Sequence, residues 1–163
     1  MDLLVISDSH GSSRRVQEAV MRTKPLAVLF LGDGLRDLDV LDEKETVRAV
    51  RGNCDWFLQS DEPLSRVESF GGVRIFMTHG HAFSVKSTLS HALAAAGAAE
   101  ADVLLYGHTH RQLESTYPAG TVLENGEVLK KPLLVVCPGS LGEGDFATLA
   151  IRQGAVLCGF GKI

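Results

Sequence analysis

The sequence predicts an α/β protein in which two β-sheets, one mostly parallel and one more antiparallel, face each other between flanking helices. Five apolar runs have the length of a buried parallel strand, namely residues 3–7, 27–31, 46–51, 73–78 and 103–106. Helical patterns separate several of these runs, which indicates βαβ units. After residue 120 the pattern changes to hairpin signals, which favour a second, more antiparallel sheet packed face to face with the first.

Three helices are expected among the first strands. Val16, Ala19 and Val20 recur at helical spacing, with a pair of serines available as the N-cap and a proline beyond the end. Leucines at positions 35, 38 and 41 predict a shorter helix. The longest helix is expected over residues 85–100, which are rich in alanine and are opened by Ser84.

The last third of the chain predicts strands joined by tight turns. Residues 121–123 and 128–129 flank an Asn-Gly pair, which is typical of a two-residue hairpin turn. Residues 133–136 predict a buried strand that ends before Pro138. Residues 146–152 and 155–158 predict a closing hairpin. No repeat, linker or low-complexity segment divides the chain, so residues 1–163 are expected to form one domain.

Composition and charge exclude several classes of protein. With 45% hydrophobic and 22% charged residues, the chain is neither collagen-like, disordered nor disulfide-rich. Its net charge of −4, without a long Lys/Arg run, argues against non-specific binding of nucleic acid.

Three further features predict a cytoplasmic protein that does not insert in a membrane. Met1 leads directly into the first strand, without the regions of a signal peptide. No apolar stretch reaches the ~18 residues needed to span a bilayer. The 3 cysteines are an odd number without CxxC spacing, which indicates reduced thiols. A homo-oligomer is compatible with the sequence, which leaves the oligomeric state open.

A polar cluster follows each of the five apolar runs. These clusters are Asp8-Ser9-His10, Gly32-Asp33, Gly52-Asn53-Cys54-Asp55, His79-Gly80-His81 and Gly107-His108-Thr109-His110. Ligands of open α/β sheets gather outside the carboxyl ends of the strands, so residues far apart in sequence are delivered to one place. Carboxylates can bridge two cations, and neutral imidazoles and an amide can complete their shells. Such a donor set without thiolate suits Mn²⁺, Fe, Co²⁺, Ni²⁺ or Zn²⁺ better than Ca²⁺ or Mg²⁺.

The five clusters, in this order, resemble the blocks of the calcineurin-like metallophosphoesterase family. The small size and the form Gly52-Asn53-Cys54-Asp55 are similar to its YfcE-type phosphodiesterase branch. The resemblance implies the sandwich fold of that family, two divalent metal ions with Mn²⁺ as the first choice, and a small phosphodiester or nucleotide as substrate. It also implies in-line attack of a metal-bound hydroxide on phosphorus.

The same resemblance implies a ligand set. The first metal would be held by Asp8, His10, Asp33 and His110. The second metal would be held by Asp33, Asn53, His79 and His108, with Asp33 as the bridge. Asn53, His79 and Asp55 are the candidate catalytic residues.

Several residues near these blocks keep two interpretations. For Asp55, as for Asp37, a helix-capping role is the alternative. His81 is expected either to contact the substrate phosphate or to support a metal ligand, and it could also be merely exposed. Trp56 could line the pocket or cover the core.

Cys54 marks a departure from the family pattern. Many members have a histidine there, to which protonation of the leaving group or steadying of the transition state is ascribed. With a thiol in its place, we expect modest turnover and a preference for esters with good leaving groups. A small buried filler is the other interpretation of Cys54.

The alternative function is a non-catalytic, protein-binding scaffold like the retromer subunit related to this family. In that scaffold the ligand blocks are degraded, whereas here the expected residue type fills every ligand position, so the sequence favours an enzyme. Other chemistries lack their signatures, because neither a nucleophile elbow nor a P-loop is present.

Overall fold

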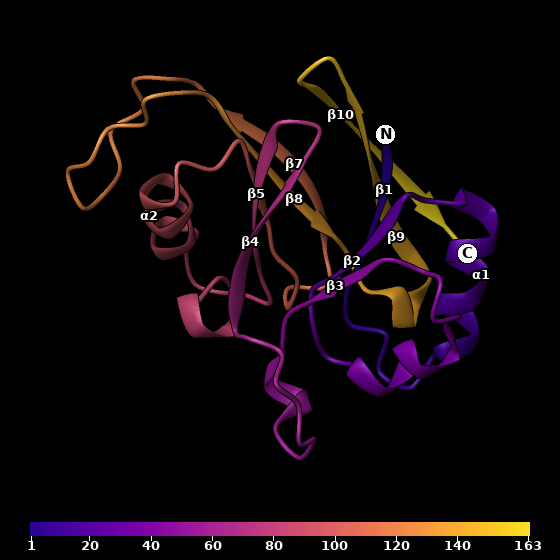
Figure 1. The fold of residues 1–163 in the computed structure, drawn as a ribbon. Coiled ribbons are helices and arrows are strands. Elements are labelled where there is room, and N and C mark those ends of the chain that lie inside the picture. Colours follow the sequence, from indigo (N-terminus) through magenta and orange to yellow (C-terminus); the bar gives the residue numbers. More distant parts are fainter.

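Two five-stranded sheets face each other, with one α-helix on each outer side, in the computed structural model, which describes residues 1–163 (Figure 1). The first sheet has the order β10-β9-β1-β2-β3 and comprises β1 (Asp2–Ile6), β2 (Ala27–Phe30), β3 (Val47–Ala49), β9 (Asp145–Arg152) and β10 (Ala155–Lys162). The second has the order β4-β5-β6-β8-β7 and comprises β4 (Ser65–Phe70), β5 (Val73–Thr78), β6 (Val103–Leu105), β7 (Gln112–Tyr117) and β8 (Leu133–Pro138).

The predicted fold class is confirmed, but the parallel strands are divided between the sheets. In the first sheet β1, β2 and β3 are parallel, and β9 and β10 add antiparallel pairs. In the second, β5, β6 and β8 are parallel, and β4 and β7 pair antiparallel at the two edges. Each sheet is therefore mixed, and neither is the mostly parallel one that was expected.

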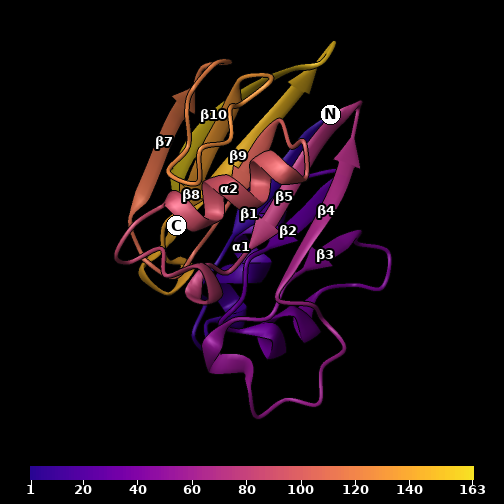
Figure 2. The same cartoon turned by 90° about the vertical axis from the view of Figure 1, so that its left-hand side faces the viewer.

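The apolar runs are continuous because both faces of the central strands are buried. In β1, Leu3 and Val5 point into the core between the sheets, whereas Leu4 and Ile6 pack toward α1 (Ser13–Thr23). Alternate residues of β6 likewise divide between the central core and a third cluster, which lies under α2 (Ser90–Ala98). Figure 2 shows α2 lying across its sheet.

The central strands agree with the sequence prediction to within two residues, and β5 has the predicted bounds. The closing hairpin is also confirmed as β9 and β10. The strands β4 and β7, which form the two edges of the second sheet, were not predicted. Residues of β7 alternate between exposed and half-buried, and its sequence is mostly polar, so it lacks the apolar signal of a central strand.

The helices are confirmed only in part. α1 has the predicted buried residues Val16, Ala19 and Val20, and residues Leu35–Val40 form a 3-10 helix, η1. The helix expected over residues 85–100 begins only at Ser90. The reason is local, because Ser84 has a left-handed φ of 54° and the Val85 N–H donates to the Gly80 carbonyl, which turns the chain away from a helical path.

The predicted hairpin over residues 121–129 is present as a turn with a minimal antiparallel ladder, and it does not extend to a pair of strands. The turn is present, with Gly126 at a φ of 84°, but a single bridge joins Val122 and Val128.

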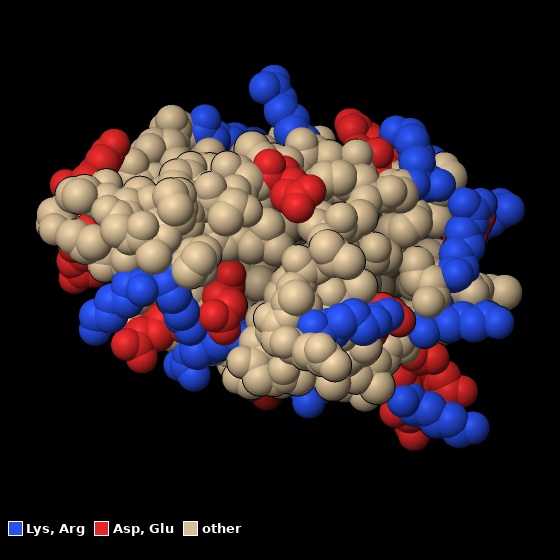
Figure 3. Space-filling model, turned by 90° about the horizontal axis from the view of Figure 1, so that it is seen from above, with Lys and Arg blue, Asp and Glu red and all other residues tan.

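Surface charge is mixed on the face at the top of Figure 1. Most of this face is uncharged, and lysine, arginine and acidic side chains are scattered over it, mainly toward its margins (Figure 3). None of the helices combines the length and the hydropathy needed to cross a membrane.

Candidate metal centre

Loops from both sheets bring the predicted ligands together at one end of the sandwich. Asp8 and His10 follow β1, Asp33 follows β2, and His79 follows β5. The last two imidazoles, of His108 and His110, follow β6. The two sheets thus contribute to one site.

The backbone is unusual at these positions. Nine residues other than glycine have a positive φ, and five of them are predicted ligands: Asp8, His10, Asp33, His108 and His110. A left-handed conformation is sterically costly for a residue with a Cβ. Such conformations are frequent at functional sites, where they orient side chains in directions that an ordinary turn does not allow.

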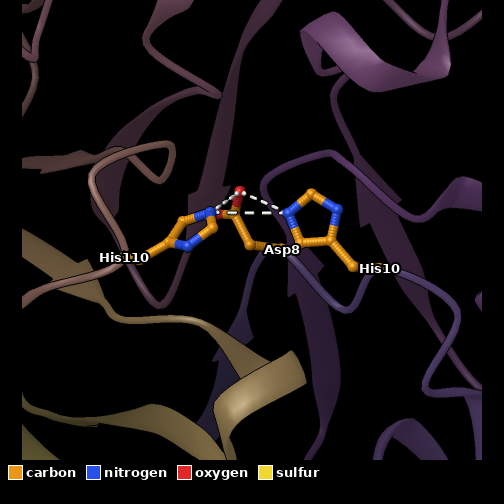
Figure 4. Close-up of side chains that lie close together, drawn as sticks. All are labelled: Asp8, His10 and His110. Carbon is orange, nitrogen blue, oxygen red and sulfur yellow. Dashed lines mark hydrogen bonds and ion pairs between the residues drawn. The ribbon is translucent and has the colours of Figure 1, made fainter.

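The first cluster consists of Asp8, His10 and His110, whose ligand atoms lie within 4.8 Å of one another. The Asp8 carboxylate is fully buried, and its Oδ1 lies 3.0 Å from His110 Nε2 and 3.5 Å from His10 Nε2. Figure 4 shows the two imidazoles converging on this oxygen from opposite sides. The other oxygen, Oδ2, accepts from Ser7 Oγ at 2.5 Å and from the His108 N–H at 3.0 Å, which fixes the carboxylate.

The second cluster consists of Asp33, His79 and His108. Asp33 Oδ2 lies 3.3 Å from His79 Nε2, and Asp33 Oδ1 accepts from the Cys54 N–H at 2.7 Å. The imidazoles of His79 and His108 meet edge to face, with their centroids 5.0 Å apart.

The clusters adjoin each other across their carboxylates. His10 Nε2 lies 4.0 Å from Asp33 Oδ2, and His79 Nε2 lies 3.9 Å from Asp8 Oδ1. Asp33 also forms a third group of ligand atoms with His10 and Cys54. Asp33 is thus the carboxylate that belongs to groups on both sides of the centre.

One buried atom shows that this donor set fits metal. His79 is fully buried, and its Nδ1 donates to the Leu31 carbonyl oxygen at 2.7 Å. This bond assigns the proton to Nδ1 and leaves the lone pair of Nε2 facing the carboxylates. His79 Nε2 has no hydrogen-bond partner, although an unpaired buried polar atom is costly. A divalent cation would satisfy both this lone pair and the neighbouring carboxylate oxygens.

The carboxylates dominate the electrostatics of the centre. Burial raises the pKa of Asp33, but the adjoining His79 imidazole and the Cys54 N–H outweigh burial and hold that pKa well below its usual range. Burial lowers the pKa of His79, but the carboxylates of Asp33 and Asp8 outweigh burial and raise it. Burial and the charge of His79 lower the pKa of His108 to about 4. A cation at this centre needs the lone pair of His79 Nε2, so the raised pKa of His79 opposes metal binding as the pH falls.

Asn53 and Cys54 lie at the exposed side of the centre. Both side chains are exposed at the start of the 3-10 helix η2 (Asn53–Asp55), and Asn53 Nδ2 donates to Cys54 Sγ at 3.6 Å. Burial and the Asp33 carboxylate raise the pKa of the Cys54 thiol, so it stays protonated at neutral pH. The interpretation of Cys54 as a buried filler was wrong, because the residue is exposed.

Asp55, a candidate catalytic residue, is buried and binds the backbone instead of facing the clusters. Its Oδ2 accepts from the N–H groups of Asp33 and Gly52, both at 2.8 Å. Its Oδ1 accepts from the N–H groups of Gly34 at 3.0 Å and Leu35 at 3.2 Å. With both oxygens engaged, the carboxylate has the contacts of the capping alternative, which favours a positioning role over direct catalysis.

Asp37 has a similar function on the opposite loop. Its Oδ2 accepts from Ser9 Oγ at 2.5 Å and from the Gly11 N–H at 2.9 Å. These bonds hold the loop that carries His10.

His81 adjoins the second cluster. Its ring centroid lies 5.5 Å from that of His79 and 6.3 Å from that of His108, and its Nδ1 is buried without a hydrogen-bond partner. Of the interpretations left open by the sequence, contact with the ligands themselves is the one that this position favours.

Two glycines allow the loops to approach the carboxylates. A Cβ at Gly52 would collide with Asp33 Oδ1, and one at Gly107 would collide with Ser7 Oγ and lie 2.9 Å from Asp8 Oδ2. The close backbone approach explains why the motifs need glycine at both positions.

The sequence analysis missed Arg36 and Phe57. Both line a pocket beside the centre whose wall also includes His10 and Asp33. Since Arg36 and Phe57 belong to no metal-binding motif, only the pair of aromatic residues after Asp55 could have pointed to this pocket.

Comparison with known proteins assigns the family. The family described as calcineurin-like phosphoesterase superfamily domain matches residues 1–154, so the chain belongs to it. A curated relative from Bacillus subtilis (strain 168), "Probable metallophosphoesterase YsnB", is 28% identical over 161 residues, which are 98% of this chain and 90% of the relative. Membership of this family supports phosphoester hydrolysis as the general activity, with divalent metal as the cofactor.

Solved structures have the same fold. A predicted phosphoesterase from Streptococcus pneumoniae TIGR4 superposes with a TM-score of 0.73 at 28% identity, covering 99% of this chain and 88% of that one. Wild-type Vps29 from Entamoeba histolytica, crystallised with Zn²⁺, gives a TM-score of 0.71 at 22% identity over 99% of both chains. The second likeness shows the fold alone.

Proposed function

We propose that this protein is a phosphodiesterase that uses two divalent metal ions to hydrolyse small phosphodiesters. The observation that carries the proposal is the buried Nε2 atom of His79, which lacks a hydrogen-bond partner and faces the carboxylates of Asp8 and Asp33. An isolated cluster of acidic residues has many explanations. A buried imidazole oriented toward two buried carboxylates and near a second pair of imidazoles is explained by bound metal.

The assignment of ligands extends the two clusters, with Asn53 and the bridging role of Asp33 taken from the family resemblance. Asp8, His10, Asp33 and His110 would hold one ion, and Asp33, Asn53, His79 and His108 the other, with Mn²⁺ as the preferred metal. Two ions at this site would supply an activated water and would stabilise negative charge on the phosphate.

The protein's own groups set the geometry for that chemistry. Asp8 is fixed through its Oδ2, so its Oδ1 faces the two imidazoles in one orientation. Asp33 is held through the Cys54 N–H, and the tautomer of His79 is held by the Leu31 carbonyl. Because these groups are already oriented, they do not have to reorganise during the reaction step.

The donor set also favours a diester with a good leaving group. A phosphodiester monoanion is attracted to a metal-loaded centre, whose cations outweigh its two carboxylates. The exposed position of Cys54 puts a protonated thiol where related proteins have an imidazole, and a thiol is a poor general acid for an alkoxide. The aryloxide of an aryl phosphodiester is a good leaving group and departs without protonation. Cytoplasmic location and the absence of a membrane partner remain part of this proposal.

The test is an assay of metal-reconstituted protein on an aryl phosphodiester, its monoester and a 2′,3′-cyclic nucleotide. We expect two metals per chain by elemental analysis, loss of activity on chelation, and the aryl diester as the best substrate. His79→Ala should abolish activity, whereas His91→Ala, a histidine on α2 outside the clusters, should not. A protein that binds two metals yet hydrolyses none of the panel would refute the enzyme.

That refuting result would favour the second candidate, the protein-binding scaffold. The likeness in fold to Vps29 over nearly the whole chain supports this candidate. The filled ligand positions and the ordered supporting hydrogen bonds favour the enzyme.

A further inference from the structure

A pocket of about 220 Å³ opens directly beside the metal centre. Its wall includes two predicted metal ligands, His10 and Asp33, and also Arg36 and Phe57. A larger cavity of about 610 Å³ lies elsewhere, between the end of α2 and residues 123–131, and none of the predicted ligands lines it. The smaller pocket is therefore the one in which part of a substrate can lie while its phosphate is at the centre.

Arg36 presents an unpaired cation to this pocket. Its side chain is exposed, and no carboxylate forms an ion pair with it. Its Cζ lies 5.4 Å from the centroid of the Phe57 ring, within the range of a cation–π contact. The guanidinium and the ring thus form two adjacent flat surfaces.

Phe57 and Trp56 are two neighbouring aromatic residues whose side chains are largely exposed to solvent. Phe57 is 56% exposed and Trp56 is 79% exposed, and their rings meet edge to face with centroids 6.0 Å apart. The segment between β3 and β4 that carries them projects from the lower end of the molecule in both ribbon views (Figures 1 and 2). Adjacent exposed aromatic rings beside a reaction centre are typical of a binding surface.

We propose that this pocket binds a planar aromatic group on one ester arm of the substrate, and that Phe57 and Arg36 determine this specificity. The inference rests on the proposed phosphodiesterase function. Rings of aryl esters and nucleobases stack on aromatic side chains and on arginine planes. The volume lies below the range of pockets for drug-sized ligands, so it suits one ring system.

A matched pair of ligands isolates the ring. Methyl benzylphosphonate and methyl cyclohexylmethylphosphonate carry the same charge and similar bulk, but only the first has a planar aromatic ring. The P–C bond on the ring side resists hydrolysis. Methyl methylphosphonate serves as the probe without a ring. Titration calorimetry on the Mn²⁺-loaded full chain gives the Kd of each, and the fluorescence of Trp56, the single tryptophan, reports whether the ring arrives at this segment.

The wild type should bind the benzyl ligand about five- to tenfold tighter than the cyclohexylmethyl ligand, with a change in tryptophan fluorescence. Phe57→Leu and Arg36→Gln should each remove most of this preference, with a much smaller effect on the affinity for methyl methylphosphonate. Phe160→Leu and Arg14→Gln are matched controls, since both residues are exposed and lie outside the pocket, and they should change none of the three affinities.

The outcomes separate this inference from the proposed function. Binding of methyl methylphosphonate without any preference for the benzyl ring would overturn the aromatic pocket alone. Equal weakening of all three ligands by Phe57→Leu would also overturn it, because the residue would then act on the centre itself. Failure of the metal-loaded protein to bind any of the three would overturn the proposed function and the pocket with it.

Discussion

Replacing Asp55 with asparagine should loosen the metal centre without removing a metal ligand. The carboxylate of Asp55 accepts four backbone N–H groups, two on each oxygen. Asparagine keeps one acceptor oxygen and puts an NH₂ group in place of the other. Two N–H groups would then face a donor, either those of Asp33 and Gly52 or those of Gly34 and Leu35, and the loop after β2 would be held less firmly in both cases.

The magnitude follows from those two lost bonds. A hydrogen bond to a charged group contributes about 1.5–3 kcal/mol, so Asp55→Asn should lower the free energy of unfolding by about 3–6 kcal/mol before relaxation. For a domain of this size 1 kcal/mol shifts Tm by about 2–4 °C, so Tm should fall by at least about 6 °C. Because either orientation of the amide loosens the loop that carries Asp33, Mn²⁺ affinity should also fall, by about 10–100-fold.

Calorimetric unfolding and Mn²⁺ titration test this prediction. Asp61→Asn is the matched control, since Asp61 is an exposed carboxylate on the same connection between β3 and β4, and neither quantity should change in it. An unchanged Tm and metal affinity together with lost hydrolysis would refute the positioning role. That result would restore Asp55 as a group that contacts the reacting phosphate.

Three further predictions concern the centre itself. Asp33→Asn should reduce the content of both metals, whereas Asn53→Ala should reduce only the second, as elemental analysis can show; full activity in Asp33→Asn would contradict its bridging role. Mn²⁺ affinity should rise as the pH rises through about 6.5 and should level off only above the raised pKa of His79, because metal competes with a proton for His79 Nε2. The rate should fall steeply below about pH 6. Calorimetry and a pH–rate profile would show this, and an optimum near pH 5 would contradict it. Cys54→Ala should change the kcat/KM of an aryl diester little, and Cys54→His should extend activity toward cyclic nucleotides; loss of aryl diester cleavage in Cys54→Ala would show that the thiol takes part in the chemistry.

The central strands could be predicted because burial on both faces leaves a continuous apolar signal. Strand β5, for example, has the bounds that its sequence predicts. The division of the parallel strands between two sheets could not be predicted in this way. It is decided by long-range pairing, since β9 returns from the end of the chain to lie beside β1. The edge strand β7 escapes detection because every second residue is exposed and its sequence is mostly polar.

In the candidate site, too, the sequence shows which residues are present but does not show where their side chains point. His79 and Asp8 are recognisable because buried strand ends have little other use for ionisable groups. Asp55 stands in the same kind of motif and is equally buried, yet its oxygens bind backbone N–H groups. An aspartate that orders a loop and one that holds a cation are the same residue in the sequence. Only the direction of the side chain in the structure distinguishes the two roles. The direction of the Asp33 side chain depends on its left-handed backbone. The strain of that conformation is offset by the hydrogen bond that the Asp33 N–H donates to the Asp55 carboxylate.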